Sequence, residues 1–508
     1  MYSQYYEKIE IQKQIFEKIL TKIAEEKNFD TRLSLAQLAA YYACSNNTGY
    51  FTSSILEKFF TDYAKTLKTD LSGIAFEKKS FLHVMSSGYR TGGHTRVVER
   101  WVRNAPQDQK HCVVFTRHKY PQLPVLISNV KEKNGYIAAL KDDLSIAGKA
   151  LELRKLAMHF EYVILHTHPE DPTALIAFGA EDFQRPVLFY NHSSHMFWLG
   201  KSIADLVLDL ISNDDATVIY RNIKNPFVLG VPSLDMKITA HDKLKCRRKT
   251  GMPADKKIIV TAGSVHRYMA IGKISFLDML KQVLDENTFC YAIGVDKDDP
   301  EWRSARTSTG NHIILPGAIP FDKGFLDYIR SADVYLDSWP LGGGAALMDA
   351  IASGVPALSL KSADPQLDYF TGTNGFCRTS AEFTEKIRKI LSDKNYAENL
   401  LEEQQNSLQK LQSQDAWNRK TEEMLRLVPD VHKVKDLSQE NDFCESNDLS
   451  VLANVIIDTG FLNRKYDVPE KEAARIIKKW LLYKRCSSCL QKYAGWSVEI
   501  YKKIRQGF

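Results

Sequence analysis

The sequence predicts an α/β protein whose two halves, each an alternation of strands and helices, are flanked by helical segments. The first observation is the stretch from Asp333 to Leu360, which contains a strand, a glycine turn, a helix and a second strand. The second is the alternation of short apolar runs with helical patterns between residues 80 and 220, and the third is its return from Lys257 onwards. This alternation is typical of parallel sheets that helices cover on both faces.

The composition indicates a soluble protein of enzyme size. The chain has 508 residues, of which 44% are apolar and 26% charged, and its formal net charge is +6. This length suggests about three domains, and the mild positive charge gives no argument for nucleic-acid binding. No apolar run is long enough to cross a bilayer, the N-terminus does not resemble a signal peptide, and six of the eight cysteines stand singly. We therefore expect a cytoplasmic protein without a disulfide framework.

The pattern of apolar residues divides the chain into four segments. In the first, residues such as Ile9, Ile15 and Ile19 recur at helical spacing, so we expect helices that pack on the rest of the chain or bind a partner. The four predicted segments are a helical N-terminal region at 1–75, a first α/β domain at 76–235, a second α/β domain at 236–430, and a linker with a helical appendage at 431–508.

The first α/β half carries a glycine turn directly after its first predicted strand, residues 80–85. Gly88, Gly92 and Gly93 form this turn, and His94 stands at the start of the next helix. Because a helix N-terminus offers free N–H groups, an anionic group could bind there, and His94 could serve as a base or as a ligand of the anion. The alternative is a helix-capping turn in which the imidazole has no chemical role.

Histidines also gather where two further strands of this half end. His166 and His168 follow the strand that begins at Tyr162, and the strand 187–190 leads into a segment of mixed polar and aromatic side chains. A metal is one interpretation of His166 and His168, but no third ligand stands at a diagnostic spacing, so we predict no metal. The next segment, 202–210, has a helical pattern. Since ligands bind beyond the carboxyl ends of parallel strands, we expect cleft positions at His166, His168, His192, His195, Trp198 and Asp205.

The second half places two cations and several glycines after its strands. Arg267 and Lys273 follow its first strand and could neutralise a diphosphate, although each could equally be a solvated surface charge. A turn at Leu315–Gly317 ends a later strand. The glycines Gly342–Gly344 precede a helix that opens near Ala345, and without Cβ atoms they would let a phosphate approach the backbone. The alternative is a tight turn that closes an ordinary βαβ unit.

These motifs together resemble the glycosyltransferases of the GT-B architecture. The Gly93-His94 turn, the two alternating halves and the strand–PLGGG–helix–GVP unit carry the resemblance, from residue 80 to residue 430. From Asp337 to Pro356 the spacing is similar to that of the O-GlcNAc-transferase-like group, which includes bacterial cytoplasmic enzymes that glycosylate adhesins. The resemblance implies two Rossmann-like domains that face a cleft, the first on the acceptor side and the second holding a nucleotide-sugar, which we expect to be a UDP-sugar.

The resemblance also implies roles for individual residues. The backbone amides after the glycines would bind the donor diphosphate, Asp349 would orient the ribose, and His94 would face the anomeric centre or the diphosphate. The catalytic candidates are His94, Arg267 and Lys273. The donor-binding candidates are Gly93, Leu315, Gly317, Gly342, Gly343, Gly344, Ala345 and Asp349.

The chain departs from the family pattern at the centre of this unit. Leu341 stands where retaining GT-B enzymes have a Glu eight residues before the second carboxylate, and Ala345 and Ala346 replace a Thr-Thr pair. We therefore expect an inverting transfer to a protein or glycan acceptor, with no metal and no cofactor. Two other functions stay open, a catalytically inactive GT-B subunit that acts as partner or chaperone of a transferase, and a sugar-nucleotide epimerase.

The C-terminal segment, residues 452–508, is rich in Lys, Arg and aromatic residues. Its helices could dock on the inner face of a membrane or on an acidic partner, and the alternative is a solvated helix face. Cys486 and Cys489 form a CxxC without a second pair, so we predict neither a zinc site nor a redox role for them.

Overall fold

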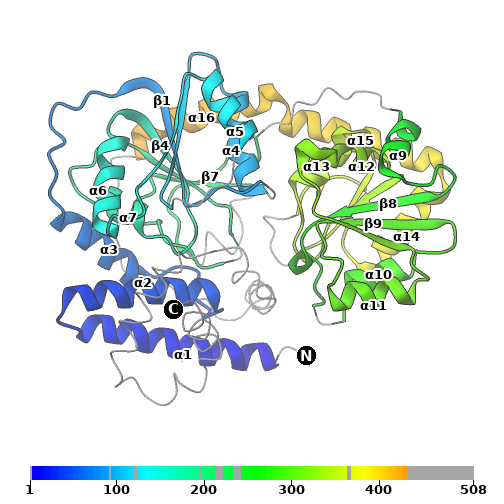
Figure 1. The fold of residues 1–508 in the computed structure, drawn as a ribbon, viewed down its shortest axis with the longest axis horizontal. Helices are drawn as coiled ribbons and strands as arrows, with labels where there is room; N and C mark the ends of the chain where they lie inside the picture. Colours follow the sequence, from blue (N-terminus) through cyan, green and yellow to red (C-terminus); the bar gives the residue numbers. More distant parts are fainter. Residues whose placement is uncertain are drawn as a thin grey trace.

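The computed structural model describes residues 3–90, 93–117, 123–194, 196–211, 221–232, 242–271, 273–362 and 368–431. Two parallel sheets with helices around them form its two halves, and three helices of the N-terminal region pack beside the first half (Figure 1). The predicted α/β class with helical flanks is confirmed for the described part of the chain. The predicted basic appendage and the CxxC pair fall outside the described residues, and the four predicted domain boundaries stay predictions.

The first sheet has seven parallel strands. In chain order they are β1 (Glu77–Met85), β2 (Lys110–Phe115), β3 (Ile137–Ala139), β4 (Phe160–His166), β5 (Val187–Tyr190), β6 (Leu206–Asp209) and β7 (Pro226–Val228). Their order in space is β3-β2-β1-β4-β5-β6-β7. The helices of this half are α4 (Gly93–Asn104), α5 (Pro124–Glu132), α6 (Ile146–Ala157) and α7 (Thr173–Phe178).

The helix predicted at 202–210 is wrong, because a turn at 201–203 leads into the strand β6 in that segment. Its four residues are buried and pair with β5 in parallel, with Leu188 opposite Leu206. A short apolar run such as Leu-Val-Leu fits a buried strand as well as a buried helix, and only the neighbouring strand decides between them.

The second sheet has six parallel strands. They are β8 (Lys257–Ala262), β9 (Thr288–Ile293), β10 (Ile313–Gly317), β11 (Val334–Leu336), β12 (Ala357–Leu360) and β13 (Phe376–Cys377). Their order in space is β10-β9-β8-β11-β12-β13. The helical elements are α9 (Lys243–Thr250), η1 (Val265–Arg267), α10 (Phe276–Lys281), α11 (Pro300–Ser308), η2 (Phe321–Lys323), α12 (Phe325–Arg330), α13 (Ala345–Ala352), α14 (Ser380–Ser392) and α15 (Lys394–Gln412).

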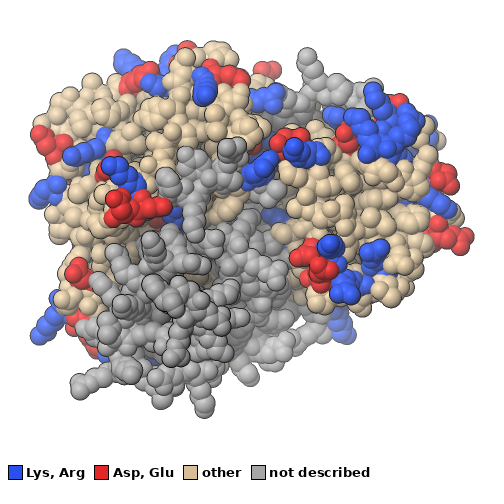
Figure 2. Space-filling view, viewed as in Figure 1, with Lys and Arg blue, Asp and Glu red and all other residues tan. Residues whose placement is uncertain are grey.

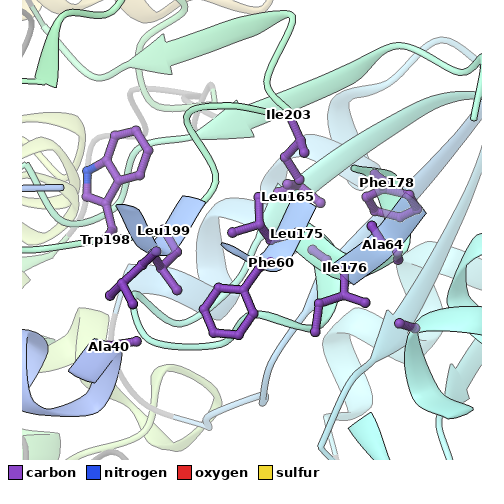
Figure 3. Close-up of a cluster of buried hydrophobic side chains, with 14 of the residues drawn as sticks. Ala40, Phe60, Ala64, Leu165, Leu175, Ile176, Phe178, Trp198, Leu199 and Ile203 are labelled. Atoms are coloured by element: carbon purple, nitrogen blue, oxygen red, sulfur yellow. The ribbon is translucent and has the colours of Figure 1, made fainter. Parts of the chain in front are cut away.

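The N-terminal helices α1 (Ser3–Glu25), α2 (Phe29–Ser45) and α3 (Ser54–Thr66) share one hydrophobic core with the first sheet. Figure 3 shows Phe60 of α3 beside Leu175 of α7 and Leu165 of β4. The buried carboxylate of Glu57, also on α3, accepts hydrogen bonds from the backbone N–H groups of Gly200 at 2.6 Å and Ser202 at 3.0 Å. The expectation that these helices pack on the rest of the chain is therefore confirmed.

The last described helix, α16 (Gln414–Val431), crosses back to the first half (Figure 1). Trp417 meets Trp101 of α4 with 5.3 Å between ring centroids, and the side-chain amide of Gln414 donates to the backbone oxygen of Asn104 at 2.7 Å. The two halves are therefore joined by a helix that packs against the first half.

Basic side chains gather most densely over α9, as Figure 2 shows. Two of them form ion pairs with the second half, Lys243 with Asp333 at 3.0 Å and Lys249 with Asp327 at 3.3 Å. These pairs fasten α9 to the residues around α12. In the described ranges, none of the helices has the length and apolar character that a membrane crossing requires.

Candidate functional site

The carboxyl edge of the first sheet brings together histidines that are far apart in the sequence. His166 is the last residue of β4, His192 follows β5, and His94 is the second residue of α4. The Nε2–H of His94 donates to the backbone oxygen of His166 at 2.9 Å, and the rings of His94 and His192 are 4.4 Å apart between centroids. Three of the predicted residues therefore form one cluster at the N-terminus of α4, directly after Gly93.

His168 extends this cluster and is held in one tautomer. Its Nδ1 lies 3.1 Å from Nη1 of Arg117, and its Nε2 lies 3.1 Å from the hydroxyl of Tyr89. Because a guanidinium only donates, Nδ1 accepts, and Nε2 carries the hydrogen and donates to the hydroxyl. Arg117 also pairs with the buried carboxylate of Glu170 at 2.8 Å. The side chain of His168 is thus fixed from both ring nitrogens.

A buried carboxylate supports the loop that carries His168. Asp171 accepts hydrogen bonds from the hydroxyls of Ser86 at 2.6 Å and Thr116 at 2.5 Å, and Ser86 in turn accepts from the backbone N–H of His168 at 2.8 Å. Burial acts to raise the pKa of Asp171, but Arg117 and the two hydroxyls outweigh it and lower the pKa below its ordinary value. Asp171 therefore stays ionised and holds the ends of β1, β2 and β4 together.

Two residues expected at the cleft lie elsewhere, so these predictions are wrong. Trp198 is 1% exposed, stacks on Phe189 with 4.2 Å between centroids, and belongs to the core that the N-terminal helices complete (Figure 3). Asp205 is buried and accepts from the backbone N–H of Val187, the first residue of β5, at 2.7 Å. Asp205 is thus at the amino edge of the sheet, where it joins β5 to β6. His195 lies outside the described residues.

The glycine turn of the second half follows β11 and is held by the side chains of Asp337 and Arg267. Oδ1 of Asp337 accepts from the backbone N–H groups of Gly343 at 2.7 Å and Ser338 at 3.0 Å. Nη1 of Arg267 donates to the backbone oxygen of Gly342 at 2.5 Å. The amide of Gly343 is therefore bonded within the protein, which corrects the expectation that it binds a diphosphate. Arg267 shapes the turn from the end of η1.

Gly344 caps α13 in a conformation that other residues rarely adopt. Its φ is +38°, and a Cβ added there would lie 2.6 Å from the ring of Tyr369. Ala345 is the first residue of α13, so the positive end of that helix points into the turn. Burial raises the pKa of Asp337 to about 7, although the hydrogen bond from the amide of Gly343 and the charge of Arg267 act to lower it.

Of the other residues predicted to bind the sugar donor or its diphosphate, two lie at the carboxyl edge of the second sheet and one does not. Gly317 ends β10 with a φ of +78°, and its backbone oxygen accepts from the N–H of Gly294 at 2.8 Å. Leu315 lies two residues earlier and is partly buried. Both stand at the carboxyl edge of the sheet, as does the glycine turn, whereas Lys273 is an exposed residue between η1 and α10.

Asp349 joins the two halves through ion pairs. Its two carboxylate oxygens accept from Arg96 at 3.0 Å and from Arg100 at 2.8 Å, both on α4. Burial lowers the pKa of Arg100 to about 10, while Asp349 acts to raise it. The role of Asp349 at the ribose stays a prediction, and in this structure both of its carboxylate oxygens are in ion pairs between the domains.

A pocket of about 290 Å³ adjoins this ion pair, between α4 and α5 on one side and η2, α12 and α13 on the other. Arg96 lies over the ring of Phe321 at 4.0 Å from its centroid. Burial raises the pKa of Glu99 to about 7, against the lowering effect of Arg96 and Arg100. The charged residues that line the pocket are Arg90, Arg96, Glu99, Arg100, Arg103, Asp322, Arg330 and Asp349.

Sequence reasoning missed His83 and His111, which contact the histidine cluster from within the sheet. The signal that could have found them is a histidine inside an otherwise apolar, buried strand. Among the described residues, no group of three or more His, Cys, Asp or Glu side chains is placed to hold a metal ion.

No protein-family model and no curated protein matches the sequence, so the relatives come from solved structures. HepE from Anabaena, in a complex with UDP and glucose, is similar with a TM-score of 0.54 and 14% identity, over 68% of this chain and 99% of HepE. The chain has the GT-B fold. Two further GT-B structures are similar over long stretches. A variant of O-GlcNAc transferase from Thermobaculum terrenum has a TM-score of 0.51 and 12% identity, over 84% of this chain and 83% of that protein. A glycosyltransferase from Rickettsia africae has a TM-score of 0.51 and 13% identity, over 70% and 99%.

The predicted GT-B architecture is thus confirmed, and identities this low establish the fold alone. In this GT-B protein the histidine cluster lies on the first domain and the glycine turn on the second. The ion pairs between Asp349 and the two arginines of α4 hold these domains together.

Proposed function

We propose that this protein is a glycosyltransferase that moves a sugar from a UDP-sugar to a hydroxyl of a protein or glycan acceptor. The observation that carries the proposal is the similarity to HepE, solved with UDP and glucose and with UDP-glucose, along 99% of the HepE chain. The similarity to O-GlcNAc transferase over 84% of this chain supports the narrower resemblance to that group, and with it a protein acceptor.

In the proposed complex the donor lies against the second domain. The amides of Gly344 and Ala345 and the positive end of α13 would bind the diphosphate, because these groups point into the turn. Arg267 would add a positive charge from η1, with the exposed Lys273 as a second cation. Leu315 and Gly317 would flank the base, while Gly342 and Gly343 would shape the turn and Asp349 would approach the ribose through the oxygen lone pairs that its ion pairs leave.

The acceptor would enter from the first domain, where His94, His168 and His192 lie together at the sheet edge; the ring centroid of His94 is 6.1 Å from that of His168 and 4.4 Å from that of His192. We propose a single displacement, in which the acceptor oxygen attacks C1 from the face opposite to the diphosphate and the configuration inverts. The bond from C1 to the phosphate oxygen breaks, and its electron pair leaves with UDP. Cationic side chains and the helix dipole would stabilise the leaving diphosphate without a metal.

The test is titration and turnover with UDP-glucose as the probe donor. UDP should raise the melting temperature, and UDP should be released when an acceptor, or slowly water, takes the sugar. His94→Ala should lower turnover about 100-fold, whereas His312→Ala, at the amino edge of the second sheet, should not. Arg267→Met should weaken UDP binding, with the exposed Arg306→Met as its control.

The outcomes separate the three functions that the sequence leaves open. Binding and transfer support the glycosyltransferase. Neither binding nor UDP release with any common nucleotide-sugar would point to an inactive GT-B subunit, which the Ala345-Ala346 pair favours. Conversion of the donor sugar without an acceptor would identify an epimerase.

A further inference from the structure

Four imidazoles form a continuous hydrogen-bonded chain across the first sheet. His111 stands on β2, His83 on β1, His166 at the end of β4, and His192 after β5. The distances are 2.9 Å from His111 Nδ1 to His83 Nε2, 3.1 Å from His83 Nδ1 to His166 Nε2, and 2.8 Å from His166 Nδ1 to His192 Nε2. The first three side chains are completely buried, and His192 is partly exposed.

All hydrogen bonds of the imidazole chain run in the same donor-to-acceptor direction, which His111 at its buried end determines. Nε2 of His111 lies 3.3 Å from the side-chain oxygen of Gln109, and an amide oxygen only accepts, so this nitrogen carries hydrogen. In a neutral imidazole the other nitrogen then accepts, so Nδ1 of His111 receives a hydrogen from Nε2 of His83. By the same argument, Nε2 of His166 donates to Nδ1 of His83, and Nε2 of His192 donates to Nδ1 of His166. Nδ1 of His192 then carries a lone pair.

Burial keeps the whole chain neutral at physiological pH. It lowers the pKa of His83 to about 3 and those of His111, His166 and His192 well below the ordinary range, to which neighbouring imidazoles also contribute. Each imidazole therefore carries one hydrogen, and the one nitrogen lone pair that no other ring of the chain uses is on Nδ1 of His192.

The surroundings of His192 are aromatic and polar groups from three elements. His94 on α4 lies 4.4 Å away between centroids, Tyr190 at the end of β5 lies 4.6 Å away, and His168 interacts with it electrostatically. Arg117, which forms an ion pair with Glu170, contacts His168. A base in this position receives its orientation from the chain behind it.

We propose that the imidazole chain fixes His192 as the proton acceptor of the transfer reaction, with His166, His83 and His111 as positioning residues. This inference rests on the proposed transferase function. When the acceptor oxygen bonds to C1 and UDP leaves, the hydrogen of the acceptor hydroxyl passes to Nδ1 of His192. The Nε2 hydrogen of His192 can then move to Nδ1 of His166, and successive transfers through His83 carry the positive charge toward His111. In other enzymes a carboxylate hydrogen-bonded to the catalytic histidine orients the ring and stabilises its charged form. Here neutral imidazoles would do the same for His192.

His83 is the residue to change, because two hydrogen bonds separate it from His192 and it contacts neither proposed substrate. His83→Phe removes both hydrogen bonds of the ring, whereas His83→Gln can donate and accept but cannot pass a hydrogen onward. For His83→Phe we expect kcat to fall at least tenfold and the acid limb of the pH–rate profile to shift, with an unchanged KM for UDP-glucose. His83→Gln should recover part of kcat. Equal kcat and pH profile in the wild type and both variants would overturn the proposal.

Nitrogen NMR of protein labelled with ¹⁵N-histidine tests the chain without any turnover. In the wild type at pH 7, His83, His111, His166 and His192 should all be neutral with hydrogen on Nε2, assigned by single His→Gln variants. In folded His83→Phe, His166 should lose its fixed tautomer, while His312→Phe should leave all four signals unchanged. Hydrogen on Nδ1 of His192 in the wild type would refute the chain even if transfer is observed. The predicted signals in a protein that fails to transfer would show that the proposed function, and not the chain, is at fault.

Discussion

Asp337→Asn should make the protein more stable than the wild type above pH 7. The carboxyl group is 2% exposed, and its Oδ1 accepts two backbone hydrogen bonds at 2.7 and 3.0 Å. Its Oδ2 is buried and has no hydrogen-bond partner among the described residues. Burial accordingly raises the pKa of Asp337 from 3.8 to about 7 in the folded protein. An asparagine can keep both hydrogen bonds through its oxygen and is neutral at every pH.

The sign follows from proton binding. Between pH 3.8 and about 7 the folded protein holds a proton on Asp337 that the unfolded chain has released. Stability from this group is therefore complete below pH 3.8 and is lost as pH rises through 7. The slope is about 1.4 kcal/mol per pH unit, which amounts to about 4 kcal/mol over the whole interval. Asp337→Asn lacks this loss, so the two proteins should differ little at low pH and most above pH 7.

The assay is urea unfolding of the wild type and Asp337→Asn across the pH range from 4.5 to 8.5. The informative quantity is the difference in unfolding free energy between the two proteins, because the other titrating groups then cancel. Asp298→Asn, a change at an exposed loop carboxylate, is the matched control and should show no such trend. Parallel pH dependences for wild type and Asp337→Asn would refute the reasoning, as would a variant that is less stable at pH 8.5.

Three further substitutions test the packing that holds the domains. Arg154→Met should lower the unfolding free energy by about 3–5 kcal/mol in urea, because this buried guanidinium donates to four backbone oxygens at 2.6–3.1 Å; a loss below 1 kcal/mol would contradict this. Asp349→Asn should cost about 3 kcal/mol, because it leaves the partly buried Arg96 and Arg100 without a countercharge. A double-mutant cycle with Arg100→Met should show coupling rather than additivity. Gly344→Ala should cost about 1–3 kcal/mol and weaken UDP binding, because its Cβ would lie 2.6 Å from an aromatic ring; Gly372→Ala, with no atom within 4 Å, should be close to wild type in a thermal melt.

The sequence by itself determined the fold class, because the signals for it are local. Apolar runs of strand length, helical spacing and glycines before helices can be recognised within about a dozen residues. They were enough to predict two parallel sheets and the N-terminal helices. They were not enough at β6, whose four buried residues fit a strand or a helix equally well until β5 lies beside them.

Only the tertiary structure decided which side chains meet. Asp349 and Arg100 are 249 positions apart, and no spacing within either helix reveals the ion pair between them. His83 joins the histidine cluster because β1 lies between β2 and β4 in the sheet, and Trp198 is buried because the N-terminal helices cover it. Burial and hydrogen-bond partners depend on which elements become neighbours in space. Packing of the whole chain decides which elements become neighbours, so the contacts of the site residues cannot be read from local sequence patterns.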